Sequence, residues 1–487
     1  MSGERKKLVL AVVDALKPEM LDRAVADGRA PVLAALIERG IYVRDCVSSF
    51  PSLTPVAAAS IATGAPPDEH GVPSMNWYHR GEERYVEYGS SFAASQAFGP
   101  VRALYDTVYN LNLAHLSRRR KTVFEHLDDA GVRTAGTTYL IYRGRTRHEP
   151  VEDGVYSRIA RAAQFRHAVW GPRELFYADI FASRETGCRS TLGMPGQRDQ
   201  HAGCVGEHLV ERDLFDFLLL SLPDNDTHSH RRGPFSQVTS IASADRALER
   251  VMGAAGGLEP FLEEHAVIVM SDHSQSPVEQ PVTLAGALDG LRVLAPADPS
   301  PEEADVAVCP GGRFAAVYVL DPDRRGELVP EIAGRLADAD GVDLCLRREG
   351  GEAIALGAAG ELRFAPGREL EDLRGARWSV AGEVGVLDLE VEGGRVASRT
   401  YPDALGRAWS ALACRTSGDV LVSAVPGYEL ADWGGGGHLG GGSHGSLHRQ
   451  DSLGVLIACG TGPRSAAARD QWTIRDAAPL VLDHFCR

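Results

Sequence analysis

Residues 8–14 read LVLAVVD, a run of six apolar residues that ends in an aspartate. A short apolar run of this kind is typical of a strand that is buried on both faces of a sheet. Two later stretches repeat the pattern, with FLLLSLPD at 217–224 and VIVMSD at 267–272. Helical patterns lie between these runs, so the sequence predicts an α/β fold, a three-layer sandwich whose central, mostly parallel sheet is covered by helices on both faces.

The chain has 487 residues, which is more than one hydrophobic core usually organises. Further core elements are expected at 31–39, 55–62, 121–130, 133–138 and 453–458. Between residues 311 and 425 the pattern changes to short elements with glycine-rich turns. We therefore expect residues 1–310 and 426–487 to form the core, and residues 311–425 to form an inserted α+β subdomain.

The charge balance excludes one class of partner and leaves another open. The net charge is -15, whereas a general nucleic-acid-binding protein needs a basic surface. A small anionic substrate can still bind if metal ions reverse the field locally. The apolar run at the N-terminus is short and lacks a cleavage site, and no stretch reaches the ~18 apolar residues that span a bilayer. These features predict a cytoplasmic location and no membrane span.

The cysteines give no sign of a zinc ribbon, because none of them forms a C-x-x-C pair. Buried free thiols are the expected state. The eight positions are Cys46, Cys188, Cys204, Cys309, Cys345, Cys414, Cys459 and Cys486.

Three of the predicted strands are followed by an aspartate at their carboxyl end, namely Asp14, Asp224 and Asp272. Each could simply cap the helix that follows or open a turn, since aspartate favours both positions. In open α/β sheets, however, ligands bind at the carboxyl ends of the strands. Three carboxylates at one edge would repel each other and resist ionising together, and bound cations are the simplest way to hold them.

Histidines lie close to two of these aspartates. Asp224 and His228 have the D-x-x-x-H spacing, which lets both side chains reach one metal ion from a single helical turn, and His273 directly follows Asp272. His444 lies in a glycine-rich segment, where the backbone can approach a site closely. Mixed histidine and aspartate ligands without cysteine favour zinc, with manganese or iron as alternatives.

Thr54 is the candidate nucleophile. It precedes Pro55 and a small-residue helix, which is the usual arrangement of an N-cap with proline at the first helical position. This structural role would explain Thr54 on its own. The same position places a hydroxyl at the positive end of a helix, where phosphate binds well, and a nearby metal ion would make that hydroxyl easier to deprotonate.

Several short motifs occur in an order that resembles the nucleotide pyrophosphatase/phosphodiesterase branch of the alkaline phosphatase superfamily. Two of them depart from the family pattern, with Thr227 and Ser274 in place of glycine. The resemblance covers about residues 8–280 and 434–465 and leaves the insertion uncovered. The motifs are FPSLTP at 50–55, TGAPPDEHGV at 63–72, PDNDTH at 223–228, SDHS at 271–274 and GSHG at 442–445.

The resemblance implies an alkaline phosphatase-like fold, two divalent metal ions and a phospho-threonine intermediate formed on Thr54. Asn76 would hold a phosphoryl oxygen, although it lies one residue further along the chain than the family spacing. One ion would be held by Asp224, His228 and His444. The other would be held by Asp14, Thr54, Asp272 and His273.

The expected function is hydrolysis of a small phosphodiester or nucleotide. A phosphomonoesterase or a phosphonate hydrolase on the same two-metal core is the alternative, because groups outside the ligand set decide the substrate. The sequence shows no clear arginine clamp for a dianionic phosphate. A sulfatase is disfavoured, since the C/S-x-P-x-R signature is missing around Thr54. A binding protein that kept the fold without activity is the non-enzymatic alternative.

Overall fold

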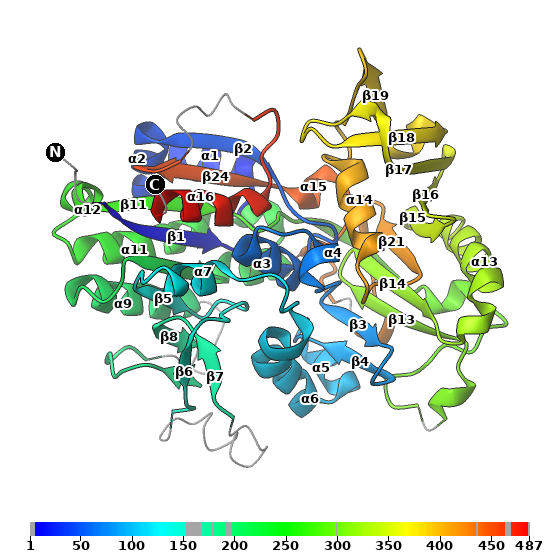
Figure 1. The fold of residues 1–487 in the computed structure, drawn as a ribbon, viewed down its shortest axis with the longest axis horizontal. Helices are drawn as coiled ribbons and strands as arrows, with labels where there is room; N and C mark the ends of the chain where they lie inside the picture. Colours follow the sequence, from blue (N-terminus) through cyan, green and yellow to red (C-terminus); the bar gives the residue numbers. More distant parts are fainter. Residues whose placement is uncertain are drawn as a thin grey trace.

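The computed structural model describes residues 5–151, 167–177, 180–189, 197–298, 300–434, 437–462 and 469–485. Within these ranges the strands gather mainly into a sheet of eight strands and a second sheet of nine. Figure 1 shows the first sheet on the left, with the N- and C-termini beside it, and the second sheet on the right.

The first sheet carries the candidate aspartates. Its strands, in sheet order, are β2 (Ile41–Val47), β24 (Leu453–Cys459), β11 (His265–Met270), β1 (Lys7–Val13), β10 (Phe217–Leu222), β5 (Thr134–Thr137), β8 (Glu174–Tyr177) and β9 (Phe181–Ala182). The five strands from β11 to β8 pair in parallel, whereas β24 and β9 run antiparallel to their neighbours, and β2 pairs antiparallel with β24. The predicted α/β fold with a mostly parallel central sheet is confirmed.

Helices cover both faces of this sheet. Alternate residues of each strand point to opposite sides, and both sides of the strands are apolar and need to be buried. Along β1, Val9 and Ala11 pack into one core cluster and Leu8 and Leu10 into the other. The first face is covered by α1 (Pro18–Ala26), α2 (Pro31–Arg39), α9 (Arg198–Glu211), α11 (Val238–Gly253) and α12 (Leu258–Glu264). The second is covered by α3 (Thr54–Thr63), α7 (Val123–Asp129) and α16 (Ala477–Phe485).

The second sheet lies between residues 306 and 424 and is almost entirely antiparallel. Its strands are β13 (Val306–Gly311), β14 (Phe314–Val319), β15 (Val342–Glu349), β16 (Glu352–Gly357), β17 (Gly360–Glu371), β18 (Arg377–Gly382), β19 (Leu389–Glu392), β20 (Arg395–Ser398) and β21 (Val420–Ala424). Helices α13 (Arg325–Ala337) and α14 (Ala404–Ala413) belong to the same region. The boundary expected at residue 311 falls inside a hairpin, because β13 pairs with β14 across a two-residue turn.

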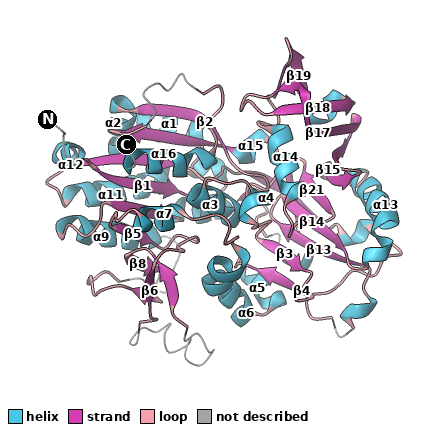
Figure 2. Cartoon of the chain, viewed as in Figure 1, coloured by secondary structure: helices cyan, strands magenta, loops and turns pink. Residues whose placement is uncertain are grey.

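Shorter elements lie outside the two large sheets, and Figure 2 shows how helices, strands and loops alternate through both halves of the molecule. The strands are β3 (Asn76–His79), β4 (Arg84–Glu87), β6 (Thr146–His148), β7 (Val169–Gly171), β12 (Ser276–Val282), β22 (Gly427–Leu430) and β23 (Gly442–Ser443). The helices are α4 (Pro67–His70), α5 (Phe92–Phe98), α6 (Pro100–Tyr105), α10 (Asp224–Arg232), α15 (Arg449–Ser452) and a π-helix over Asp106–His115. Short 3₁₀ turns cover Pro234–Ser236, Ala285–Ala287, Pro301–Glu303, Pro322–Arg324, Val384–Leu387, Asp432–Gly434 and Ile474–Asp476.

A buried arginine bonds the second sheet to the first. Arg313 lies in the turn between β13 and β14 and is fully buried. Its Nη1 lies 2.5 Å from Asp451 Oδ1 and also donates to Ser276 Oγ, while its Nη2 donates to the carbonyl of Ala424. Its backbone N–H donates to the carbonyl of His444 at 2.7 Å. The inserted hairpin therefore supports the segment that carries a candidate metal ligand.

Replacing Arg313 with methionine is expected to reduce the free energy of unfolding by about 3–5 kcal/mol, because the buried Asp451 would lose its counter-charge. Urea unfolding of the full chain measures this loss. Arg335→Met is the matched control, since Arg335 is half-exposed on α13, where it pairs with Glu331 and donates to the carbonyl of Asp289 at the surface. The control should change stability by less than about 1 kcal/mol. Equal effects of the two substitutions would contradict a supporting role for Arg313.

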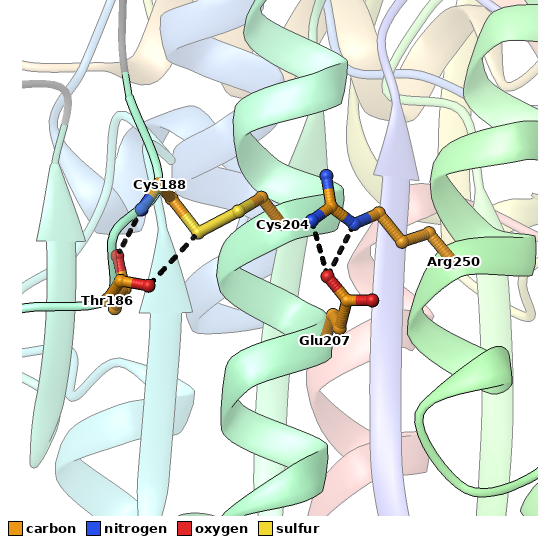
Figure 3. Close-up of a disulfide and its surroundings, with 5 residues drawn as sticks. All are labelled: Thr186, Cys188, Cys204, Glu207 and Arg250. Carbon is orange, nitrogen blue, oxygen red and sulfur yellow. Dashed lines mark hydrogen bonds and ion pairs between the residues drawn. A yellow bond between two sulfur atoms is a disulfide. The ribbon is translucent and has the colours of Figure 1, made fainter.

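One cysteine pair departs from the sequence expectation. Cys188 and Cys204 form a disulfide that joins the segment before α9 to α9 itself (Figure 3). The prediction of free thiols throughout is therefore wrong for these two residues, whose 16-residue separation gave no sign that the fold brings them together. Glu207, one turn further along α9, binds Arg250 of α11. The free and buried cysteines are Cys46, Cys309, Cys345, Cys414 and Cys459, and Cys486 lies outside the described residues.

Candidate active site

The candidate residues converge at the carboxyl edge of the first sheet. Asp14 directly follows β1, and Asp272 and His273 follow β11, the parallel neighbour of β1. Thr54 begins α3, and His444 directly follows β23. The arrangement is the one expected for an open α/β sheet, in which side chains at strand ends face a shared ligand site.

His273 lies at the centre of the first group of side chains. Its Nε2 is 3.2 Å from Thr54 Oγ1, 3.5 Å from Asp14 Oδ1 and 3.5 Å from Asp272 Oδ2. The other ring nitrogen, Nδ1, lies 3.1 Å from the carbonyl of Ser274, which fixes the orientation of the ring. One side of His273 is thus anchored to the backbone, and the other side faces the threonine hydroxyl and two carboxylates.

The two carboxylates of this group differ in their support. Asp272 Oδ1 accepts the backbone N–H of Ala15 at 3.1 Å and that of His273 at 2.9 Å, so its position is fixed by the ends of β1 and β11. Asp14 Oδ1 is buried and has no hydrogen-bond partner among the described residues. A buried carboxylate oxygen without a donor is costly, and a cation would satisfy it.

A second group surrounds Asp226. Its Oδ1 lies 3.3 Å from His230 Nε2 and 3.6 Å from His444 Nε2. Both histidines are anchored through Nδ1, His230 by the carbonyl of Gly442 and His444 by that of Ser52, each at 2.8 Å. Anchoring of the far ring nitrogen by a carbonyl is characteristic of metal-binding histidines, because it selects the tautomer and directs Nε2 into the site.

The two groups adjoin each other. The rings of His273 and His444 stack with their centroids 3.8 Å apart. Among the described residues, two sets of side chains place their ligand atoms within 4.8 Å of one another, and they are Asp226, His273 and His444, and Asp14, Asp272 and His273. The geometry therefore provides room for two neighbouring cations that share one edge of the sheet.

The pair that the sequence predicted beside His444 lies elsewhere. Asp224 accepts Arg198 Nε at 3.0 Å and the backbone N–H of Asp199 at 3.0 Å, and these bonds join the start of α10 to the start of α9. His228 Nε2 lies 3.1 Å from the carbonyl of Ser236. Asp224 and His228 are thus hydrogen-bonded to other residues of the protein. In their place, Asp226 lies close to both His230 and His444.

The sequence contained a signal for this alternative register. The D-x-x-x-H spacing occurs twice in succession, as Asp224 with His228 and as Asp226 with His230. Both pairs lie in one helix, and residues two positions apart point in different directions around a helix. The choice between the pairs depends on which face of α10 meets the sheet edge, which spacing alone does not reveal.

Thr54 does not act as the N-cap that the sequence suggested. The helix begins at Thr54 itself, the residue before it is Leu53, and no side chain caps this end. The Thr54 hydroxyl instead faces His273 Nε2. Because the helix does not use the hydroxyl, it is available to the site.

Asn76 lies at the start of the β3–β4 hairpin and is buried. Its Nδ2 donates to Glu87 Oε2 at 2.9 Å, and its Oδ1 has no hydrogen-bond partner among the described residues. Within the described part of the chain, no hydrogen bond joins Asn76 to the two ligand groups, so its role at a phosphoryl oxygen stays a prediction. His70 is buried and bonds to Ser60 Oγ and to the backbone N–H of Val72, which gives it a structural role.

Burial and crowding dominate the electrostatics of the site. Burial, followed by the charges of Asp272 and Asp226, holds the pKa of Asp14 well above its usual range. Burial also raises the pKa of Asp272 to about 6. It lowers the pKa of His273 to about 4 and that of His444 to about 3. Burial raises the pKa of Asp226 as well, but His230, His444 and His273 outweigh it and hold that pKa below its usual range, while Asp226 raises the pKa of His230 against the effect of burial. A divalent cation beside the neutral His273 and His444 would supply the positive charge that keeps Asp14 and Asp272 ionised.

The donor set fits divalent metal ions. It combines imidazole nitrogens, carboxylate oxygens and one hydroxyl, with no thiolate, which suits zinc and also manganese or iron. The carboxylates of Asp14, Asp226 and Asp272 face imidazoles that are anchored from behind. The residues present therefore fit the two cations that the sequence resemblance implies.

The sequence of this chain is similar to that of one known protein family. The profile of the family described as type I phosphodiesterase / nucleotide pyrophosphatase matches residues 8–338. No curated protein matches the sequence.

Solved structures share the fold. Phosphonoacetate hydrolase from Sinorhizobium meliloti 1021, in complex with phosphonoformate, is 19% identical with a TM-score of 0.56, and the alignment covers 99% of this chain and 96% of that chain. Human ectonucleotide pyrophosphatase / phosphodiesterase 5 is 12% identical with a TM-score of 0.56, covering 98% and 94%. An inactive threonine-to-alanine form of the murine protein, in complex with AMP, is 12% identical with a TM-score of 0.58, covering 98% and 94%.

Proposed function

Because this chain belongs to the type I phosphodiesterase / nucleotide pyrophosphatase family, whose members hydrolyse phosphate esters, we propose that it is a metal-dependent phosphodiesterase that uses Thr54 as its nucleophile. The observation that carries the proposal is the position of the Thr54 hydroxyl. It lies at the N-terminus of α3, 3.2 Å from His273 Nε2, and His273 belongs to both sets of candidate ligand side chains.

The threonine assignment has independent support from a relative. The murine ectonucleotide pyrophosphatase / phosphodiesterase 5 that was solved with AMP is an inactive form in which one threonine is replaced by alanine. In this chain Thr54 is the threonine that lies next to the ligand groups. A nucleophilic threonine at a helix N-terminus also accounts for the absence of a side-chain cap on α3.

The chain's own residues define the reaction in outline. The substrate phosphorus would approach Thr54 Oγ1, where the backbone N–H groups at the start of α3 favour the negative charge of a phosphate. Thr54 attacks phosphorus and gives up its proton to solvent, while the bond to the leaving oxygen breaks on the opposite side and that oxygen takes up a proton, so that the alcohol or nucleotide departs. Water then hydrolyses the phospho-threonine and restores the hydroxyl, so one ester bond is exchanged for one molecule of water.

Two divalent cations are part of the proposal, and zinc is the favoured identity. Asp226, His230 and His444 would hold one ion. Asp14, Thr54, Asp272 and His273 would hold the other. When bound, such ions lower the pKa of a hydroxyl and stabilise the negative charge that develops on the attacking and leaving oxygens.

Removal of the metal ions is expected to abolish turnover of bis-p-nitrophenyl phosphate, since Thr54 would lose its activation and the carboxylates would repel the substrate. The measurement is the rate after dialysis against a chelator, with metal content determined in parallel. Adding back Zn²⁺, Mn²⁺ or Fe²⁺ separately should restore the rate and identify the metal. Full activity in protein that is free of metal would refute the dependence.

A phosphonate hydrolase is the second candidate, because the phosphonoacetate hydrolase shares the fold over 99% of this chain. Rates on bis-p-nitrophenyl phosphate, p-nitrophenyl phosphate, a dinucleotide and phosphonoacetate decide between the candidates. We expect the diester and the dinucleotide to be turned over fastest. A higher kcat/KM on phosphonoacetate would assign the chain to the second reaction, and a higher value on the monoester would assign it to the phosphomonoesterases.

The location of the protein in the cell stays a prediction. Among the described helices, none is both long and apolar enough to cross a membrane. The Cys188–Cys204 disulfide argues against the cytoplasmic location predicted from the sequence, because such bonds persist mainly in oxidising compartments.

A further inference from the structure

A cavity of about 660 Å³ lies in the inserted region, apart from the ligand groups. Its walls come from the start of α13, the end of β15, the end of α14 and the residue after β3. None of the candidate metal ligands lines it. Its volume is within the range of about 300–1,000 Å³ that is usual for small-molecule sites.

The charge of this cavity is opposite to that of the protein. Five arginines line it against two acidic residues, whereas the whole chain has a net charge of -15. The acidic residues are Glu349 and Asp419. The arginines are Arg80, Arg325, Arg347, Arg348 and Arg415.

The guanidinium groups are only partly neutralised. Asp419 accepts Arg80 Nη2 at 2.9 Å and lies 3.8 Å from Arg325 Nε, so one carboxylate serves two arginines. Glu349 accepts Arg347 Nη1 at 2.5 Å. Arg415 is exposed and forms no ion pair with a described residue.

Arg347 and Arg80 each keep one hydrogen-bond donor that the described residues leave unpaired. Only 6% of Arg347 is exposed, yet its Nε has no hydrogen-bond partner among the described residues. The Nε of Arg80 is likewise buried without a partner. Leaving buried donors unpaired is costly, so the protein itself does not fully satisfy either guanidinium.

Other contacts hold the arginines in place. The guanidinium of Arg80 lies 4.8 Å from the ring of Tyr318 and donates to the carbonyl of Ser417. Arg348 lies over the ring of Trp409 at 4.9 Å. Planar guanidinium groups that are fixed by stacking lose little freedom when they bind a phosphate or carboxylate.

We infer that this cavity binds a small molecule that carries a diphosphate group. The excess of three arginines over carboxylates matches the charge of such a group, since its terminal phosphate carries about -1.5 to -2 near neutral pH and its inner phosphate adds a further negative charge. Guanidinium forks fit the oxygens of phosphate in pairs. Val329, Pro330 and Leu412 line the same cavity and offer an apolar surface to an organic part of the ligand.

The experiment is a calorimetric titration of the full chain carrying Thr54→Ala, which prevents turnover of the probes. The probes are pyrophosphate, ADP, AMP and citrate. Pyrophosphate and ADP should bind saturably, and ADP should bind more tightly if the organic part contacts the cavity. AMP should bind at least about tenfold more weakly, because it lacks one set of charge-assisted hydrogen bonds. Citrate binding as tight as ADP would overturn the preference for phosphate.

The cavity is distinguished from the catalytic centre by substitution. Arg348→Gln with Arg415→Gln, both at exposed side chains, should weaken pyrophosphate and ADP binding at least about tenfold. Arg347→Gln should do the same, with thermal unfolding as a check on its fold. The matched control is Arg399→Gln, whose exposed side chain in the same region lies outside the cavity and should leave binding unchanged.

The two proposals fail separately. In a chain that retains Thr54, the Arg348→Gln, Arg415→Gln double variant should keep normal turnover of bis-p-nitrophenyl phosphate. A chain without phosphodiesterase activity would still bind pyrophosphate at the arginines if the cavity is a site. Binding that persists unchanged in the double variant belongs to the catalytic centre and refutes the cavity site.

Discussion

Replacing Thr54 with alanine is expected to reduce kcat on bis-p-nitrophenyl phosphate by at least about a thousandfold, which is the scale seen when an enzyme loses its nucleophile. The protein should fold normally, because the α3 helix does not use the hydroxyl as a cap. Most of the bound metal should remain, since Asp14, Asp272 and His273 are unchanged. Steady-state kinetics and metal analysis of the same preparation measure both quantities.

Two controls sharpen the test. Thr54→Ser retains a hydroxyl at the same place and should keep a measurable part of the activity, together with the covalent phosphoryl-enzyme. Thr63→Ala removes a hydroxyl from the same helix that donates to the carbonyl of Ala59 and accepts the backbone N–H of Ala65, and this variant should turn over like the unaltered chain. Substantial turnover by Thr54→Ala would show that another group, or water, attacks phosphorus.

Replacing Asp226 with asparagine is expected to have the second largest effect. The substitution removes the carboxylate charge that faces both His230 and His444. Metal affinity at that site should fall at least about a hundredfold, because loss of even an indirect partner of a metal ligand costs about 10–100-fold. Turnover should fall with it. His230→Ala should show the same pattern, and metal titrations with the purified variants provide the measurement.

The matched controls are the neighbouring pair. Asp224→Asn disrupts bonds to Arg198 and to the backbone of Asp199, so it should lower thermal stability but leave the bound metal in place. His228→Ala should also retain its metal, because His228 faces the carbonyl of Ser236. If Asp224→Asn and His228→Ala lost the metal while the other pair kept it, the ligand register drawn from the sequence would be the correct one.

The central sheet could be predicted from the sequence, because the residues of its individual strands show that they are buried on both faces. The apolar runs that end in Asp14 and Asp272 are buried on both faces, and only a sheet covered on both sides accommodates such runs. The limits of the inserted region could not be set in the same way. β13 is apolar like the strands of the core, and only its antiparallel pairing with β14 assigns it to the second sheet.

The site could be predicted where backbone position decides the direction of a side chain. Asp14, Asp272 and His273 end parallel strands, so their meeting follows from the sheet, and Thr54 follows from the helix that it begins. Within α10, by contrast, the ligand face depends on packing against neighbouring segments. The Cys188–Cys204 disulfide escaped prediction for a similar reason, since nothing local to either cysteine records that the segment before α9 returns to it.

The turn at residues 312 and 313 has a consequence for any attempt to divide this protein. A Cβ at Gly312 would lie 2.4 Å from the carbonyl oxygen of His444, and the next backbone N–H donates to that same oxygen. The inserted region is therefore not an interchangeable module. A chimaera that takes residues 306–424 from a relative would also need the matching segment around His444. A shortened enzyme that lacks residues 306–424 would lose the support of this candidate metal ligand before it lost the central sheet.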